Sequence, residues 1–509
     1  MTLTSLSYFI LIAAALVLYY AVKPLQKYVL LAASVYFYVS VSSADPRRTA
    51  LLMLGVTAVT YLGALAIERT EKFLRGFVLF LCVGALVGTL FVLKYAYNLI
   101  NLFASVFAGG TLVSAFQFAS VIGISYYSLS AIGYLVDVYW QSYKAERNPF
   151  TVALFIFWFP QLISGPFTRF SEMRGQFCEK HCLSYDGFTA GARRMLFGYF
   201  KKLVISERFG LVVSEVFGNY RSYGPVGIIG ATLCYAVQLY TDFSGCMDII
   251  TGTSQLFGIE LPENFRAPFF SETVQEFWQR WHITLGTWFR DYLMYPVQKS
   301  GFVQKAGKGA KKLLGKKAGK KVPFYMSMLL LWILIGIWHG GTSYYFIASA
   351  AIPCVLLMLS DILQPLFKKT NSLLHIEGSP IWLRILRRIR TLLLICICWT
   401  VVCAGSTQDA LAAFAQILHG PVSTEAFRSL PAFLAAAERF GLLLPDLAIM
   451  LGGLIVLYVT DRIAYKGSSV FEKLSGSCLA LRLACVYGEV LLIYFFGMLG
   501  SSEFIYFQF

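Results

Sequence analysis

Two histidines stand in apolar surroundings, where an ionisable side chain is costly. His282 follows a tryptophan in "EFWQRWHITLGTWF", and His339 ends the apolar run "MSMLLLWILIGIWH". Burial favours a neutral imidazole because it penalises the charged form, and a neutral imidazole can take a proton from a hydroxyl near neutral pH. The two residues are therefore candidate catalytic groups for the attack of an alcohol on an activated carbonyl, although the residues alone leave a structural or transport role open.

Neighbouring residues fit the same chemistry. Trp338 offers an N–H donor, and Gly340 and Gly341 allow a close backbone approach. The proline-bounded turn "PENFRAPFF" can hold Asn264 and Arg266 in a fixed place.

One amphipathic helix is predicted to carry His282. Glu276 and Arg280 lie four residues apart on its polar side, which makes a favourable pair. Its aromatic and apolar residues recur at steps of three and four, which predicts a single stripe suited to the membrane interface. The stripe consists of Phe277, Trp278, Trp281, Leu285, Trp288 and Tyr292.

Polar residues interrupt the preceding apolar run, "YAVQLYTDFSGCMDIITG". Tyr240, Asp242, Ser244 and Asp248 stand there, and acids inside a buried helix need partners or a water-filled cavity. For Asp248 a helix–helix contact is an equal alternative. For Asp242, between Tyr240 and Ser244, we expect a role in shaping a cavity, with Trp281 and Trp288 as further lining residues.

Membrane-spanning helices must position these residues. The chain of 509 residues is 57% hydrophobic, only 14% charged, and has a mean hydropathy of +0.65, which excludes a soluble globular protein of this length. Apolar runs recur from end to end and predict an all-α, polytopic bundle of roughly eleven to thirteen transmembrane helices with additional re-entrant or interfacial pieces. The first apolar segment lacks a basic flank and is expected to be a retained helix.

The net charge of +16 is concentrated in one place. Nine lysines and no acid lie between Lys299 and Lys321, and removing that segment leaves +7. The positive-inside rule predicts a cytoplasmic loop over residues 298–322, with "RILRRIR" at 384–390 on the same side. This explanation is preferred to nucleic-acid binding. The cysteines lie mostly in apolar spans, and Cys178 and Cys182 beside His181 lack the second cluster that a metal site needs, so no metal is expected.

The organisation predicted from these patterns is one integral membrane domain over residues 1–509. Polar, proline-containing stretches make its middle irregular, and residues 405–509 add further C-terminal helices. A transporter that moves an acyl or glycan intermediate is a competing class, but the chain shows no internal repeat of the kind that marks many transporters.

The chain resembles the membrane-bound O-acyltransferases in their bacterial branch. The matching motifs keep the family's order and place an acyltransferase core at residues 120–345. They are "GISYYSLSAIGYLVDVY" (123–139), "PQLISGPFTRF" (160–170), "QLYTDFSGCMDIITG" (238–252), "PENFRAPF" (262–269), "EFWQRWHITLGTWFRDYLMYPV" (276–297) and "GIWHG" (336–340).

This resemblance implies a helical bundle enclosing a transmembrane tunnel and O-acyl transfer from a thioester donor to a hydroxyl. His339 matches the family's principal histidine, and His282 matches a position that is often asparagine in eukaryotic members. His339 would be the general base or a transient acyl carrier. The oxyanion donor would be His282, Asn264 or the Trp338 indole. The phosphates of acetyl-CoA would favour arginines, for which the candidates are Arg266, Arg280 and Arg290.

Two groups of the branch compete. The chain has the length and the aromatic ending, "SSEFIYFQF", of alginate O-acetyltransferase-like proteins, which act in exopolysaccharide or cell-wall modification. The D-alanyl transfer proteins of teichoic acid synthesis are typically shorter and take D-alanine from a carrier protein. We favour the first group and expect acetyl-CoA as donor with no permanently bound cofactor. The expected partners are membrane lipids, an extracytoplasmic acetyltransferase or esterase-like protein, and, in the alternative, a cytoplasmic carrier protein.

Overall fold

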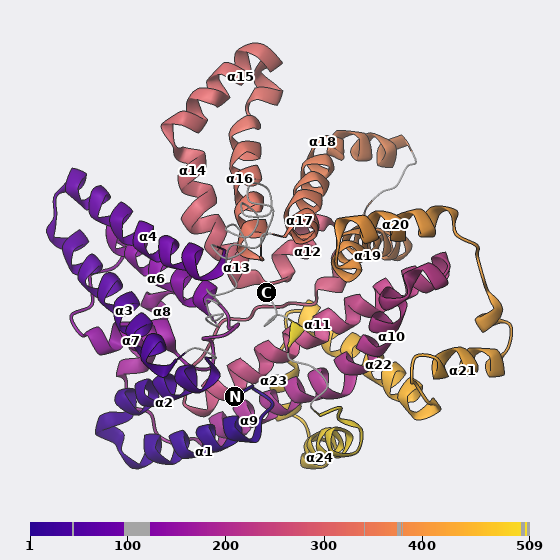
Figure 1. The fold of residues 1–509 in the computed structure, drawn as a ribbon, viewed down its shortest axis with the longest axis horizontal. Helices are drawn as coiled ribbons and strands as arrows, with labels where there is room; N and C mark the ends of the chain where they lie inside the picture. Colours follow the sequence, from indigo (N-terminus) through magenta and orange to yellow (C-terminus); the bar gives the residue numbers. More distant parts are fainter. Residues whose placement is uncertain are drawn as a thin grey trace, which may run out of the picture. The chain divides into compact units, whose positions relative to one another are not determined.

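The structure is a computed structural model that describes residues 1–42, 45–95, 123–340, 342–373, 378, 380–499 and 504–505. Every secondary-structure element in these ranges is helical, which confirms the all-α prediction (Figure 1). The α-helices are α1 (Leu6–Ala21), α2 (Gln26–Val41), α3 (Pro46–Arg69), α4 (Lys72–Lys94), α6 (Ile124–Tyr139), α7 (Pro149–Phe157), α8 (Phe170–Cys178), α9 (Tyr185–Tyr199), α10 (Glu207–Gly218), α11 (Pro225–Leu256), α12 (Val274–Arg280), α13 (Ile283–Phe289), α14 (Tyr295–Lys299), α15 (Gly301–Gly319), α16 (Val322–Trp338), α17 (Ser343–Phe346), α18 (Ile352–Leu373), α19 (Ile381–Ala404), α20 (Thr407–His419), α21 (Leu430–Glu438), α22 (Leu444–Tyr465), α23 (Val470–Ser475) and α24 (Leu479–Phe496).

Shorter helical segments of other types connect them. Three are π-helical, namely η2 (Phe200–Ser206), η5 (Arg290–Met294) and η6 (Ile347–Ala351). The 3₁₀ segments are η1 (Lys23–Leu25), η3 (Tyr220–Ser222), η4 (Pro268–Phe270) and η7 (Glu425–Phe427).

The described chain folds as two compact units. The first contains Met1–Leu196 and Cys246–Pro262, and the second contains Phe197–Gly245 and Glu263–Ile505. His282 and His339 both belong to the second unit. The predicted boundaries of a single domain, of the 120–345 core and of the 405–509 segment do not follow this division and stay predictions.

Several helices can cross a bilayer. Six helical segments are long and apolar enough by themselves, and the number rises to eight if the bent pairs α1–α2 and α15–α16 each form one span. The chain is therefore a multi-pass membrane protein. Within the described residues this number is lower than the eleven to thirteen spans predicted. The apolar run at residues 191–217, for example, does not qualify as a span, because seven of its residues are charged.

Aromatic packing organises the first unit. The rings of Tyr8, Phe37 and Phe159 lie 5.8 to 6.4 Å apart between centroids, and the Tyr38 hydroxyl donates to that of Tyr127 at 3.0 Å. Tyr38 and Tyr127 thus bury their hydroxyls with a partner, as buried polar groups require.

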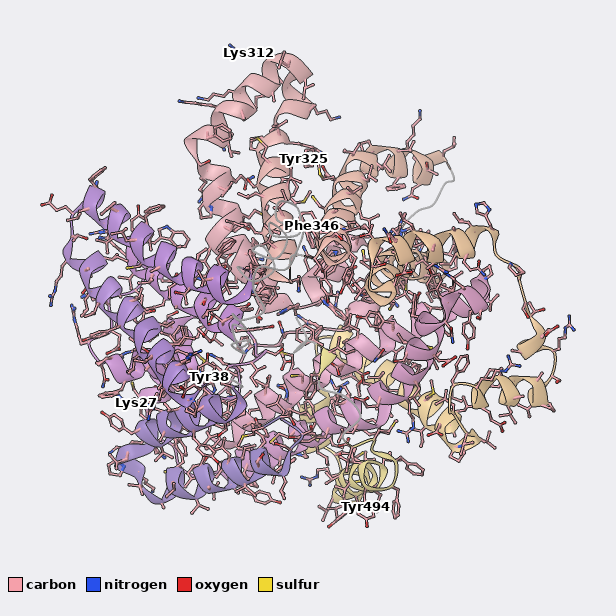
Figure 2. The ribbon with its side chains drawn as sticks, viewed as in Figure 1. Lys27, Tyr38, Lys312, Tyr325, Phe346 and Tyr494 are labelled. Atoms are coloured by element: carbon pink, nitrogen blue, oxygen red, sulfur yellow. The ribbon has the colours of Figure 1, made fainter. Side chains whose placement is uncertain are left out.

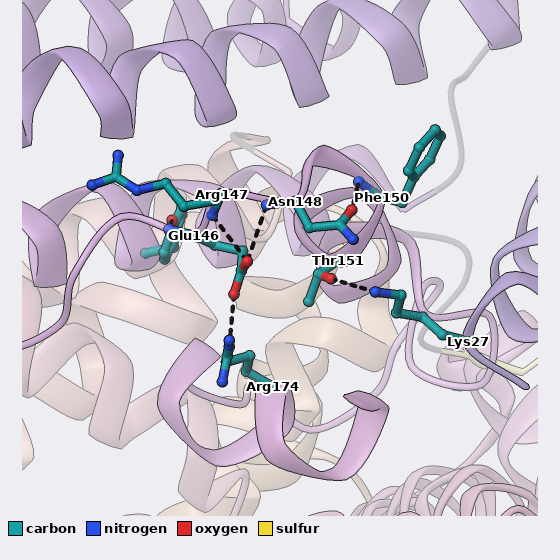
Figure 3. A network of polar contacts seen from close by, with 8 residues as sticks. Lys27, Glu146, Arg147, Asn148, Phe150, Thr151 and Arg174 are labelled. Carbon is teal, nitrogen blue, oxygen red and sulfur yellow. Dashed lines mark hydrogen bonds and ion pairs between the residues drawn. The ribbon is translucent and has the colours of Figure 1, made fainter. Parts of the chain in front are cut away.

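A carboxylate fixes the start of α7 in the same unit. Glu146 Oε1 accepts the backbone N–H groups of Arg147 and Asn148 at 2.9 and 3.0 Å, and its Oε2 accepts from Arg174 Nε at 2.6 Å (Figure 3). Burial alone would raise the pKa of Glu146, but Arg174 and the two N–H groups hold that pKa below its usual range. The residues that lead into α7 are therefore held in a fixed arrangement.

The lysine-rich segment, predicted as a cytoplasmic loop over residues 298–322, contains the helix α15. Ser300 caps α15 by accepting the Val303 N–H at 3.5 Å, and lysine and alanine are good helix formers. Non-helical torsions at Gly315 (φ +80°) kink the helix, and Lys312 lies near this bend (Figure 2). The cytoplasmic location of the segment stays a prediction.

Candidate active site

The turn at residues 263–267 and the chain at residues 280–284 are joined by backbone hydrogen bonds in the second unit. The Arg266 N–H donates to the Arg280 carbonyl at 3.0 Å, and the Ile283 N–H donates to the Asn264 carbonyl at 2.9 Å. The turn is therefore fixed, as its prolines predict, and the structure places it beside His282.

His282 lies where the helical path breaks. Its backbone is left-handed (φ +48°, ψ +52°) at the start of α13, and its side chain is buried. A residue other than glycine held in this region costs about 1–3 kcal/mol, and such strain gathers at functional sites. The break also corrects the prediction of one continuous amphipathic helix, because α12 ends at Arg280 and α13 begins at Ile283.

The side chain of Asn264 compensates the strain. Its Oδ1 accepts from the Thr284 N–H at 3.1 Å, from Thr284 Oγ1 at 2.9 Å, and from His282 Nδ1 at 3.2 Å. Because a backbone N–H donates to this atom, it must be the amide oxygen, which can only accept. His282 Nδ1 therefore carries the proton, and the neutral ring presents its lone pair on Nε2.

His339 lies at the carboxyl-terminal end of a helix. It caps α16 directly after Trp338, and its N–H donates to the Ile335 carbonyl at 3.0 Å. The Trp338 ring lies 4.9 Å and the Tyr345 ring 6.0 Å from its imidazole, and Gly340 follows with φ +141°. Since the carbonyl end of a helix favours positive charge, α16 stabilises an imidazolium at His339. Gly341 lies outside the described residues.

The two imidazoles influence each other. Burial holds the pKa of His282 well below its usual value, and the charge of His339 lowers it further. Phe243 adds an apolar wall, with its ring edge-on to the His282 ring at 4.9 Å. Thus His282 remains neutral at pH 7. A proton on His282 would be repelled by a protonated His339, which is why His339 lowers the pKa of His282. We call these two residues the imidazole pair.

Aromatic rings surround this break in the chain. Trp281 is buried, with Phe265 at 5.0 Å, Phe277 at 5.5 Å and Trp399 at 5.6 Å between ring centroids. The ring of Trp288 lies 5.2 Å from those of Phe289 and Tyr292. Trp281 therefore lies in the break after α12, and Trp288 lies within α13, instead of both on one stripe. Their predicted lining of a cavity, and the tunnel itself, stay predictions.

The polar residues of α11 have partners from other elements. Tyr240 donates to Asp461 of α22 at 2.7 Å, and Ser244 accepts from Lys201 at 3.0 Å. Asp242 is fully buried, and its Oδ1 lies 2.7 Å from Lys202 Nζ. The acids expected to need partners or a cavity thus have partners. Asp248, in the first unit, pairs with Arg194 at 3.0 Å.

The two lysines of η2 are functional candidates that the sequence reasoning missed. Lys202 Nζ also contacts Glu207 at 2.6 Å, and its side chain is 2% exposed. The backbone N–H of Ile505 adds a hydrogen bond to Asp242 Oδ2 at 2.9 Å. Adjacent lysines within the apolar run "GYFKKLVIS" were the available signal. We call Lys201, Lys202, Glu207, Asp242 and Ser244 the lysine cluster.

The predicted phosphate-binding arginines divide into two groups. Arg280 Nη1 donates to the Arg266 carbonyl at 3.1 Å, and Arg280 pairs with Glu276 at 2.9 Å, which confirms the predicted i,i+4 pair. Arg266 and Arg280 are therefore neighbours of the imidazole pair. Arg290 Nε instead contacts its neighbour Asp291 at 3.0 Å, and no described contact joins it to Arg266 or Arg280.

Fold and site together define a class, a multi-pass helical membrane protein with two imidazoles gathered beside a fixed turn. Comparison of sequences shows which proteins the chain is similar to. The sequence model of the membrane-bound O-acyltransferase family matches residues 83–309, so this part of the chain is similar to that family. The match includes His282 and ends before His339.

Individual relatives match over similar lengths. A probable alginate O-acetylase of Pseudomonas syringae pv. tomato is 37% identical over 45% of this chain and 40% of its own length. A peptidoglycan O-acetyltransferase of Helicobacter pylori is 31% identical over 66% of this chain and 64% of its own length. A teichoic acid D-alanyltransferase of Bacillus subtilis is 27% identical over 45% and 56%. The chain spans about half the length of the curated relatives it matches.

Proposed function

We propose that this protein is a membrane-bound O-acyltransferase that moves an acetyl group from a cytoplasmic thioester donor to a hydroxyl of an extracytoplasmic polysaccharide or cell-wall polymer. The observation that carries the proposal is the imidazole pair, in which a neutral, buried His282 is electrostatically coupled to His339. The alginate and peptidoglycan acetyltransferases among the relatives support acetyl as the acyl group.

His339 acts as the general base. It accepts the proton of the acceptor hydroxyl as the hydroxyl oxygen forms a bond to the thioester carbonyl carbon. The resulting imidazolium is stabilised by the carbonyl end of α16. When the tetrahedral intermediate collapses, the carbon–sulfur bond breaks and the departing thiolate takes the proton, so His339 is regenerated and the thiol and the acetyl ester are the products.

The other groups position the reactants. His282 Nε2, which carries the lone pair, accepts a hydrogen bond and orients the acceptor hydroxyl before transfer. Because the Nδ1-protonated ring has no proton on Nε2, His282 is not the oxyanion donor. We assign that role to the Trp338 indole N–H, whose ring lies beside that of His339. Asn264 Oδ1 is occupied by its three donors and holds His282 in place.

The donor approaches from the cytoplasmic face. The lysines of α15 and the arginines at 384–390 would lie on that face by the positive-inside rule, in the cell membrane. The acetyl group then passes to the acceptor directly or through an extracytoplasmic transferase partner.

The test uses purified protein in proteoliposomes. Acetyl-CoA and a D-alanyl-loaded carrier protein are supplied separately, and release of free thiol is measured with and without a soluble polysaccharide acceptor. Thiol release from acetyl-CoA that depends on His339 is expected. Release only from the D-alanyl carrier would move the protein to the D-alanyl transfer group, for which the relative from Bacillus subtilis is the supporting observation. No release from either donor would contradict the proposal.

A further inference from the structure

Three guanidinium groups meet at the end of α22. The Cζ atoms of Arg280 and Arg388 lie 4.9 and 5.1 Å from the centroid of the Tyr465 ring. A Cβ atom built on Gly467, two residues further on, would lie 3.5 Å from Arg266 Nη2. The cluster thus joins the 263–267 turn, α12, α19 and α22, which are far apart in the sequence.

Carboxylates do not neutralise this cluster. Among the described residues, Arg280 pairs with Glu276, while neither Arg266 nor Arg388 has a carboxylate oxygen within 4.0 Å. The nearby Glu272 already contacts Arg387 at 3.3 Å. Like charges held this close need a counter-charge to be favourable.

A structural explanation accounts for only part of the charge. The carbonyl end of α22 provides about half a negative charge, which favours cations there. With Glu276 included, three guanidiniums still leave an excess of about 1.5 positive charges. Arg388 also has a buried Nε with no hydrogen-bond acceptor on the described chain, which is a costly arrangement for a donor that serves packing alone.

The arginine cluster is built on the same turn as the imidazole pair. The bond from the Arg266 N–H to the Arg280 carbonyl lies next to the bond from the Ile283 N–H to the Asn264 carbonyl. A ligand held by the guanidiniums therefore has its other end directed along the turn that carries His282. Guanidinium forks match phosphate oxygens in geometry and charge, and they stack on aromatic rings while doing so.

We propose that Arg266, Arg280 and Arg388 form a phosphate-ester site, stacked on Tyr465, that holds the phosphate-bearing end of the thioester donor. This inference rests on the proposed function for the identity of the donor. The predicted phosphate-binding arginines were Arg266, Arg280 and Arg290. The proposed site contains Arg388, from the basic stretch at 384–390, in place of Arg290. A phosphate ester also occurs in the headgroup of anionic lipids, and the experiment separates the two sources.

The experiment uses the full chain in nanodiscs of zwitterionic phosphatidylcholine. Binding of coenzyme A is compared with binding of pantetheine, which has no phosphate, for the wild type, Arg388→Gln and Arg388→Lys. Arg384→Gln, one turn earlier on the same helix, is the matched control. Arg388→Gln is expected to weaken coenzyme A binding about tenfold or more, since charge-assisted pairs are the strong hydrogen bonds. Arg388→Lys should recover only part of the loss, and pantetheine binding and Arg384→Gln should be unchanged.

Two other results would overturn the phosphate site, and a third would contradict only the proposed function. Equal coenzyme A affinity in the wild type and in folded Arg388→Gln, with folding checked by an unchanged Tm, overturns the proposal. So does an Arg388-dependent loss of co-purified phosphatidylglycerol without a change in coenzyme A binding, which would assign the site to a lipid headgroup. Arg388-dependent coenzyme A binding by a protein that transfers no acetyl group would support the phosphate site and contradict only the proposed function.

Discussion

The second unit buries polar side chains in two regions that treat charge in opposite ways. In the lysine cluster, Lys202 lies between two carboxylates at 2.6 and 2.7 Å, so its positive charge has a counter-charge on two sides. In the imidazole pair, burial and mutual repulsion keep His282 uncharged. The lysine cluster holds its charges in short ion pairs, whereas a neutral imidazole can accept a proton and return it near neutral pH. The comparison assigns stability to the first region and chemistry to the second.

The largest effect on the rate of acetyl transfer is expected from a substitution in the imidazole pair. His339→Ala should lower the rate of acetyl transfer by about 10²- to 10⁴-fold, the usual contribution of a general base. The Tm should be nearly unchanged, because His339 is only half-buried. Single-turnover transfer from acetyl-CoA in proteoliposomes measures the rate. A variant with wild-type transfer would remove His339 from the mechanism.

Removing Lys202, the cation between the two carboxylates of the lysine cluster, should lower stability more than it changes the chemistry. Lys202→Ala leaves Asp242 and Glu207 buried without their counter-charge, which costs about 3–5 kcal/mol of folding free energy. Thermal unfolding in mild detergent measures the loss. Glu276→Gln is the control, because its partly exposed pair with Arg280 contributes only about 0.3–0.5 kcal/mol. A Lys202→Ala protein with wild-type Tm but no activity would move the lysine cluster into the chemistry.

Asn264 sharpens the comparison, because it acts on His282 only through positioning. Asn264→Leu is similar in size but removes the acceptor for His282 Nδ1 and for Thr284. Loss of a fixed geometry of this kind typically costs on the order of 10²-fold in rate. The variant should lower kcat more than it raises KM for acetyl-CoA. An effect confined to KM would mean that Asn264 binds the donor instead.

The smallest effect concerns pH. Because the pKa of His282 is lowered in the folded protein, the unfolded chain binds the extra proton more readily below its own pKa of about 6.5. Stability is therefore fully present above that pH and falls on acidification by about 1.4 kcal/mol per pH unit. Because other buried groups also titrate in this range, the contribution of His282 is the difference between the slopes that unfolding shows for the wild type and for His282→Asn between pH 7 and 5.5. The slope should be reduced in His282→Asn, and equal slopes would show that another group titrates.

Local patterns made some features of the site predictable. The Glu276–Arg280 pair follows from helical spacing alone, and the fixed turn at Asn264 follows from its flanking prolines. The apolar surroundings singled out both histidines, and the motif resemblance pointed to the family to which residues 83–309 are similar. These features depend on residues within a few positions of one another or on recognition of a shared sequence.

Long-range contacts account for what was missed. The helix break at His282 is held by Asn264, 18 residues earlier, so the aromatic spacing of residues 277–292 wrongly predicted one continuous helix. The partner of Asp242 is Lys202, 40 residues away and on a π-helical segment. The arginine cluster combines side chains from four elements, which no periodicity in the sequence can indicate.

The central claim is that His282 and His339 form one coupled site in which His282 stays uncharged. Histidine-selective ¹³C and ¹⁵N NMR of the protein in nanodiscs tests it, because the chain has only five histidines and His282 can be assigned with His282→Asn. The account predicts a neutral, Nδ1-protonated His282 from pH 8 to 5.5, with a pKa that rises in His339→Gln. A His282 signal that titrates near pH 6.5, or that is indifferent to residue 339, would contradict it.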